Sequence, residues 1–294
     1  MSAGSPTGEP RVQRGHRAHR LSVVANLGLA GLKLGVGWLA GSQVLLADGV
    51  HSLSDVALSA GAWIGYRWSQ TPPDEDHHFG HGNGEALAGL FVGLVLLAAA
   101  GGLAYATLRW ESTIQVDALG FAALGVVAVV LGVKAWLALE VGRVGRELAS
   151  PSLLAVARDH RSDVFASLLV LLAVGASLAG LPWIELAGAV AISLLIARMG
   201  WTSVREGFDV LMDRVPDPEL RGRIAATAAA VEGVRGVQRV RVHPLGSSYQ
   251  VDLEISVDGS LTVSEGHAIA HAVADSVRAE HERAGGVQVH VNPT

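Results

Sequence analysis

The chain has 294 residues, of which 50% are hydrophobic and 17% charged, and its formal net charge is −5. A soluble domain has about 25% charged residues, so this composition excludes an ordinary soluble protein and favours one embedded in a lipid membrane. The small negative charge gives no reason to expect a nucleic-acid partner. Because cysteine is absent, disulfides and thiolate metal ligands are excluded.

Residues 1–20 form a basic tail that lacks the apolar core of a signal peptide. Beyond the tail, six apolar stretches are each close to the ~20 residues that a helix needs to cross a bilayer. We expect a six-helix transmembrane domain over 21–209, with spans at 21–41, 44–68, 84–108, 116–140, 153–180 and 182–207. Arginine is concentrated in the tail and after the fourth span, so the positive-inside rule places both termini in the cytoplasm.

The character of the sequence changes at residues 210–294, where we expect a small cytoplasmic α+β domain. Apolar periodicity predicts helices over 217–233, with Asp217 as the N-cap, and over 262–283, beginning at Thr262 or Ser264. Alternating apolar and polar residues predict strands over 237–243 and 249–257, and a last short strand covers 287–291. The order αββαβ predicts a ferredoxin-like, metallochaperone-like sheet with its helices on one face.

The second and fifth spans each carry two metal-capable side chains four residues apart, His51 with Asp55 and Asp159 with Asp163. Positions i and i+4 share one face of a helix, and an ionisable group in the bilayer costs at least ~2.5 kcal/mol. Either pair alone could be a polar contact between helices. Two pairs with the same spacing predict one cation site, and three carboxylates with one imidazole suit Zn²⁺, Fe²⁺ or Mn²⁺.

Two neighbours of these pairs are weaker candidates. Asp48 precedes His51 by three residues and could support the site or simply lie near a helix end. His160 is one residue away from Asp159, so we expect its side chain to point elsewhere.

Two further groups of residues outside the spans could bind metal. Asp74, His77 and His81 have spacings of three and four in the loop after the second span, although an ordinary solvated acidic loop would look similar. In the C-terminal domain, metal-capable side chains fall on different expected elements and would share an ion only if the fold brought them together. They are Asp252, His267 and His290.

Three motifs resemble those of the cation diffusion facilitator family of divalent-metal transporters: ADGVHSLSD at 47–55, FGHG at 79–82 and RSD at 161–163. The resemblance covers the chain from about residue 20 to the end. It implies a homodimer that exports divalent cations from the cytoplasm in exchange for protons. We expect Zn²⁺ or Fe²⁺ to be the exported cation, with Mn²⁺ as a further candidate, and we expect no prosthetic group and a location in a bacterial plasma membrane. The resemblance also implies that the intramembrane pairs, the loop group and the C-terminal group described above are its three metal sites.

Two positions depart from the pattern of this family. Many zinc-exporting relatives have His where this chain has Asp159, and many have Lys where it has Asn83. That Lys typically pairs with an aspartate at the base of the sixth span, which would be Asp213 here, to hold the dimer together. The departures are similar to the magnetosome-type iron branch of the family, so iron is a candidate substrate.

The sequence therefore predicts a secondary transporter and not an enzyme. The predicted mechanism is proton-coupled antiport, in which His51 carries a coupling proton because imidazole titrates nearest to physiological pH. A metal-sensing membrane scaffold that binds cations without moving them is the alternative. A metallohydrolase is disfavoured because no His-Glu-x-x-His pattern is present.

Overall fold

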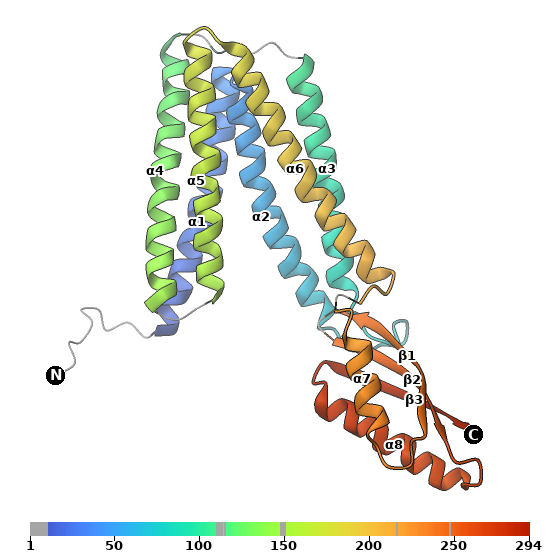
Figure 1. Ribbon diagram of the computed structural model, residues 1–294. Coiled ribbons are helices and arrows are strands. Elements are labelled where there is room, and N and C mark those ends of the chain that lie inside the picture. The colour runs from blue at the N-terminus through green and yellow to red at the C-terminus, as the bar shows by residue number, and fades with distance from the viewer. Residues whose placement is uncertain (1–10, 110–113, 115, 148–150, 216, 247) are drawn as a thin grey trace, which may run out of the picture. The chain divides into compact units, whose positions relative to one another are not determined.

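The computed structural model describes residues 11–109, 114, 116–147, 151–215, 217–246 and 248–294 (Figure 1). Six long helices precede a small mixed domain: α1 (Arg11–Ala40), α2 (Gln43–Ser69), α3 (Gly84–Arg109), α4 (Ala118–Glu147), α5 (Pro151–Leu178) and α6 (Pro182–Leu211). Residues 1–10 of the predicted tail lie outside the described residues, whereas residues 11–20 form the start of α1.

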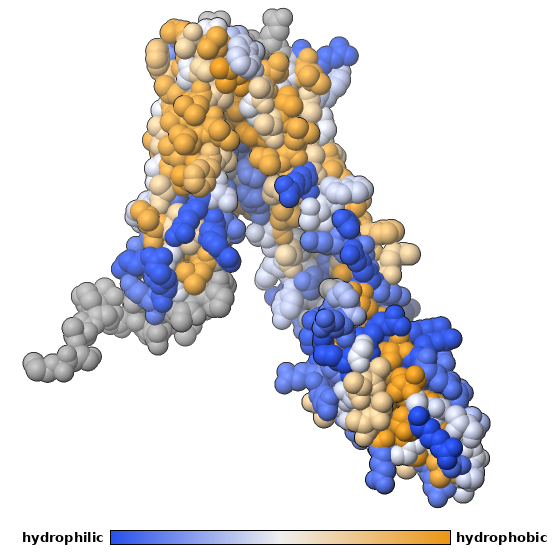
Figure 2. All heavy atoms as spheres, in the orientation of Figure 1, coloured by the Kyte–Doolittle hydropathy of each residue, from blue (hydrophilic) through white to orange (hydrophobic). Residues whose placement is uncertain are grey.

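Within the described residues, five of these helices are long and apolar enough to cross a membrane. The remaining long helix, α2, has 27 residues and carries Asp48, His51 and Asp55, which lower its hydropathy. Large apolar side chains on the outer faces of the helices are exposed, among them Leu139 of α4 and Phe165 of α5. Figure 2 shows hydrophobic residues over the greater part of these two helices, with hydrophilic residues at their lower ends. Such a surface suits lipid and not water, so the predicted fold class of a polytopic helical membrane protein is confirmed.

The first of two compact parts comprises the described residues within 11–59 and 94–201. In it α4 packs along both α1 and α5, and the three helices run side by side in Figure 1. Val141 and Val144 of α4 are buried against Leu153 and Ala157 of α5. A Cβ added at Gly145 would lie 3.1 Å from the Leu153 Cβ, so small residues allow the two helices to approach closely.

The second part comprises residues 60–93 and 202–294 and contains the C-terminal domain. Its elements follow the predicted order: α7 (Leu220–Ala229), β1 (Gly236–Leu245), β2 (Ser248–Val257), α8 (Val263–Glu280) and β3 (Ala284–Pro293). The sheet has the order β1-β2-β3, with β1 antiparallel and β3 parallel to β2. The predicted α+β domain is therefore confirmed.

One face of this sheet is buried under the two helices. Val251, Leu253 and Ile255 of β2 belong to a core that also holds Ile224 of α7 and Val273 of α8. Residues on a strand alternate between faces, so the polar residues between these three lie on the opposite, exposed face.

The two helices of the domain begin differently from one another. The predicted helix over 217–233 starts later, because the carboxylate of Asp217 accepts from the N–H of Glu219 (2.9 Å) and closes a turn ahead of the helix. The expectation that Asp217 is the N-cap is therefore wrong. In α8 the predicted start is confirmed, since Thr262 is the N-cap and forms a capping box with Glu265.

Candidate metal centres

The helices α2 and α5 bring three of the four predicted intramembrane ligands together. His51, Asp55 and Asp163 each offer one ligand atom, and these atoms all lie within 4.8 Å of one another. All three side chains are partly buried. A first-row dication bonds to nitrogen and oxygen at about 2.1 Å, so two of its ligand atoms are at most ~4.2 Å apart. Side-chain movements of about 1–2 Å would therefore let the three residues hold one ion.

Asp159 lies on α5 one turn before Asp163, but its side chain is exposed and is not part of this group. The two aspartates still share a helix face, as their spacing of four requires. The structure thus places the fourth predicted ligand next to the site and not in it.

A buried lysine that the sequence patterns did not predict contacts the site directly. The Nζ of Lys134, on α4, lies 2.5 Å from Oδ2 of Asp163 and 2.8 Å from Oδ1 of Asn26 on α1. Its side chain is only 2% exposed. Asp163, one of the three potential metal ligands, is thus paired with a positively charged side chain of the protein itself.

A second buried lysine lies one helix away in the same part of the molecule. The Nζ of Lys33, on α1, is 2.7 Å from Oδ2 of Asp48 and 3.0 Å from Oγ of Ser52. Both members of the ion pair are 2% exposed. Asp48 is therefore the partner of a buried ammonium group. Lone lysines in apolar stretches were the available signal for both pairs, because an ionisable residue in a membrane helix usually marks a site.

His160 lies beside the site, so the expectation that it points elsewhere is wrong. Its Nδ1 is 3.8 Å from Oδ2 of Asp163, and its Nε2 is 2.7 Å from Oγ of Ser22. Residues i and i+3 are neighbours on a helix, so His160 and Asp163 meet although His160 and Asp159 diverge. The imidazole therefore lies beside the Asp163 carboxylate, although 3.8 Å is too long for a hydrogen bond between them.

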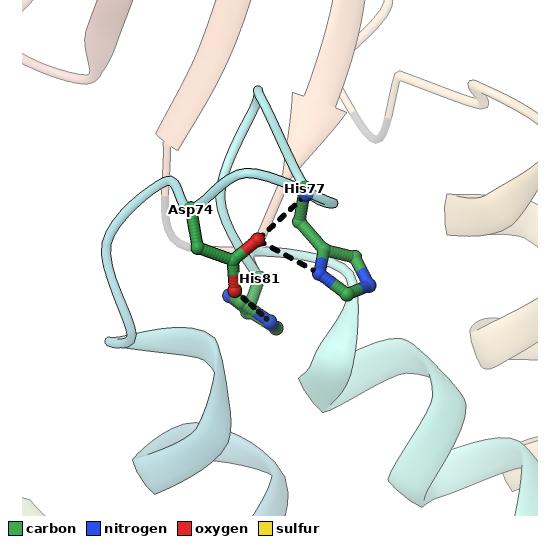
Figure 3. A group of neighbouring side chains, drawn as sticks. All are labelled: Asp74, His77 and His81. Carbon is green, nitrogen blue, oxygen red and sulfur yellow. Dashed lines mark hydrogen bonds and ion pairs between the residues drawn. The ribbon is translucent and has the colours of Figure 1, made fainter.

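The loop between α2 and α3 holds a second group of potential ligands, shown in Figure 3. Asp74, His77 and His81 each offer one atom within 4.8 Å of the others. Oδ1 of Asp74 accepts from the N–H of His77 (2.7 Å) and lies 3.1 Å from its Nδ1, while Oδ2 lies 3.5 Å from Nε2 of His81. The carboxylate thus holds both imidazoles on one side of the loop.

This loop group is open to solvent on one side. The side chains of Asp74 and His77 are 48% and 56% exposed, whereas that of His81 is 10% exposed. The hydrogen bond from the N–H of His77 holds the pKa of the Asp74 carboxyl below its usual value. The group therefore combines an ionised carboxylate and an imidazole that face solvent with the largely buried imidazole of His81, a donor set that suits a borderline dication.

The loop also touches the C-terminal domain. A Cβ added at Gly82 would lie 2.9 Å from the carbonyl carbon of Leu245, at the end of β1. One at Gly246, whose φ is +59°, would lie 2.7 Å from the carbonyl oxygen of Gly82. Glycine thus permits backbone contact between the metal-capable loop and the β1–β2 turn.

The three predicted ligands of the C-terminal domain do not converge within one chain. Asp252 is exposed on the sheet face opposite the helices, and His290 shares that face because it pairs with Glu254 in the register of β2 and β3. His267 lies on α8, across the sheet from both. Its Nε2 is instead 3.1 Å from Nε2 of His271, one helical turn further on.

Asp213, which follows α6, has a partner other than residue 83. Its carboxylate lies against Nδ1 of His243 on β1, so an aspartate–histidine contact ties the end of the last membrane helix to the C-terminal sheet. Asp213 has a φ of +61°, a conformation that is uncommon for residues other than glycine.

Two family models match the chain. The model of the cation efflux transmembrane domain matches residues 20–212, and that of the cation efflux protein cytoplasmic domain matches residues 216–294.

Curated relatives are similar over nearly the whole length. Metal tolerance protein 2 of Oryza sativa subsp. japonica is 31% identical, with 94% of this chain and 77% of the relative covered. The manganese efflux system protein MneP of Bacillus subtilis is 30% identical, with 96% and 97% covered. Magnetosome protein MamB of Paramagnetospirillum magneticum is 30% identical, with 88% and 87% covered. Among solved structures, MamM-CTD 215-293 is 33% identical and covers 25% of this chain and 92% of its own, with a TM-score of 0.25.

Proposed function

This chain belongs to the cation efflux family, whose members are membrane transporters and not enzymes, and from that premise we propose that it exports Mn²⁺ through a site built on His51, Asp55 and Asp163. The observation that carries this proposal is the convergence of the three ligand atoms within 4.8 Å, on two different helices of the membrane part. Ionisable groups are costly in a bilayer and are retained where they serve transport.

Manganese is our first candidate because the donor set is rich in oxygen. The three converging residues supply two carboxylates and one imidazole, and Asp159 next to them adds a third carboxylate. Carboxylate ligands suit Mn²⁺, whereas Zn²⁺ and Fe²⁺ accept more nitrogen. Two relatives from Bacillus subtilis are named manganese efflux proteins, and another relative is a magnetosome protein. Fe²⁺ and Zn²⁺ are the competing substrates.

Transport would follow from the chemistry of these ligands. A carboxylate must be ionised and an imidazole neutral to bind a metal, so loading the site releases protons. Protons that enter from outside would compete the metal off when the helices expose the site to that side, so a proton gradient would drive export. His51 is our candidate for a coupling proton carrier.

The accessory sites and the assembly complete the proposal. Asp74, His77 and His81 would collect cations at the cytoplasmic mouth of the pathway. The C-terminal domain would join two copies in a homodimer at the bacterial plasma membrane, with both termini cytoplasmic. A metal ion held by Asp252 or His290 would then need ligands from the second copy, because His267 lies on the other face of the sheet.

Metal accumulation in cells tests the proposal. We would express the chain in a bacterium that lacks its own manganese exporter and measure cellular Mn, Fe and Zn by mass spectrometry. The wild type should lower cellular Mn, and Asp55→Ala should abolish this effect at equal membrane abundance. Asp76→Ala, which changes an exposed loop carboxylate outside both ligand groups, is the matched control and should export normally. Export by Asp55→Ala at the wild-type rate would refute the proposal, and unchanged metal levels with the wild type would favour a scaffold.

A further inference from the structure

Lysine is rare in this chain and its two positions are specific. The sequence has two lysines and twenty arginines, and both lysines are buried among the membrane helices beside a carboxylate. Arginine is planar and binds carboxylates bidentately, whereas the lysine ammonium is a compact charge with three rotatable donors on a flexible stem. A chain that otherwise relies on arginine thus uses lysine where a buried cation meets an aspartate.

Lys134 is the lysine that contacts one of the three potential metal ligands, Asp163. Its Nζ is held by Asp163 (2.5 Å) and by Asn26 (2.8 Å). Because the ammonium has three donors, it can give up Asp163 to an incoming metal ion and keep the amide oxygen of Asn26. Its side chain is 2% exposed, so the ammonium lies beside the site and not in solvent.

The charges near the site therefore include a fixed positive one. Asp55 and Asp163 carry two negative charges, and Lys134 leaves the group at −1. A dication held by His51, Asp55 and Asp163 alone would bring the group to +1. Recruiting Asp159, one turn from Asp163 on α5, would bring the loaded site to zero, the charge that is cheapest to keep in a bilayer.

We propose that Lys134 is a built-in counter-cation of the transport site. Its ammonium contacts both Asp163 and Asn26 in the empty site, keeps only Asn26 when a dication binds, and makes Asp159 the third carboxylate that the loaded site requires. The inference rests on the proposed function and adds to it a reason for an aspartate at position 159. An imidazole there would leave the loaded site with a net positive charge.

Equilibrium binding of Mn²⁺ to the full chain in nanodiscs tests this charge relation. Free Mn²⁺ would be measured by its paramagnetic resonance signal, in an Asp74→Ala background that removes the loop group. Lys134→Met should tighten binding by about tenfold or more, because the metal no longer competes with a buried ammonium. Asp159→Asn should weaken binding by a similar factor. The double variant should return to within about threefold of the wild type.

Lys134→Arg provides the matched control, because it keeps the positive charge beside Asp163 and should therefore not tighten binding. Improved affinity is an informative outcome because a variant that merely misfolds would lose binding.

Different binding results would refute the counter-cation role of Lys134 and the proposed transport site. If Asp55→Ala abolishes Mn²⁺ binding while Lys134→Met weakens binding or leaves it unchanged, the counter-cation role is wrong and the transport site stands. The counter-cation role is also wrong if the double variant binds Mn²⁺ as weakly as Asp159→Asn does. If Asp55→Ala binds Mn²⁺ like the wild type, the proposed site itself is wrong.

Discussion

Replacing Lys33 with methionine tests how far buried ion pairs stabilise the helical part. In the native chain the Lys33 ammonium contacts both Asp48 (2.7 Å) and Ser52 (3.0 Å), and each member of the ion pair is 2% exposed. Lys33→Met leaves the Asp48 carboxylate buried without its cation. Removing one partner of a buried pair typically costs about 3–5 kcal/mol, because the remaining charge is not compensated.

That cost should be visible as a loss of thermal stability. At roughly 2–3 °C per kcal/mol, Lys33→Met should lower the Tm by about 10 °C, measured by the temperature at which the detergent-solubilised protein loses its monodisperse elution peak. Lys33→Met with Asp48→Asn removes both charges and should recover most of the loss, since a buried pair is often replaceable by neutral groups. A Tm for Lys33→Met within about 2 °C of the wild type would refute the reasoning that this pair is desolvated.

Three further outcomes are expected outside the membrane. Gly82→Val should weaken Mn²⁺ binding by the loop group, measured by equilibrium dialysis, because its Cβ would meet the Leu245 backbone at 2.9 Å; unchanged binding would show that this contact is dispensable. His271→Ala should abolish Ni²⁺ binding by the C-terminal domain, followed by calorimetry on the full chain, if its contact with His267 at 3.1 Å forms a two-imidazole site. The hydrogen bond from Arg223 lowers the pKa of Asp217. Its stabilising effect is therefore present above the ordinary pKa of 3.8 and is lost as the pH falls further. The Tm of Asp217→Asn should consequently be lower than that of the wild type at pH 6, and the two Tm values should converge in more acidic solution.

Much of the fold could be predicted because its determinants are local. Long apolar stretches marked the membrane helices, and alternation marked the strands of the C-terminal domain. The spacing of four residues also predicted that His51 and Asp55 share one helix face, and in the structure their ligand atoms lie within 4.8 Å of that of Asp163. These features depend on the periodicity of a single element.

The residues of the site that could not be predicted are positioned by contacts between segments that lie far apart in the sequence. Lys134 meets Asp163 from 29 residues away and Asn26 from 108 residues away, and no local pattern specifies such pairs. The presence of a lysine in an apolar helix was a sufficient reason to look for a partner. His160 could have been assigned from its spacing of three from Asp163. In the C-terminal domain, by contrast, the separation of Asp252 from His267 follows only once the helices are known to cover one face of the sheet.

The most direct test of the account is a flux measurement with the purified full chain in proteoliposomes. An imposed proton gradient should drive Mn²⁺ movement, reported by a metal-sensitive dye, together with proton movement in the opposite direction, reported by a pH-sensitive dye. We expect both fluxes in the wild type and neither in Asp163→Asn at equal protein content. Equal fluxes in the two proteins would contradict a transport site between α2 and α5.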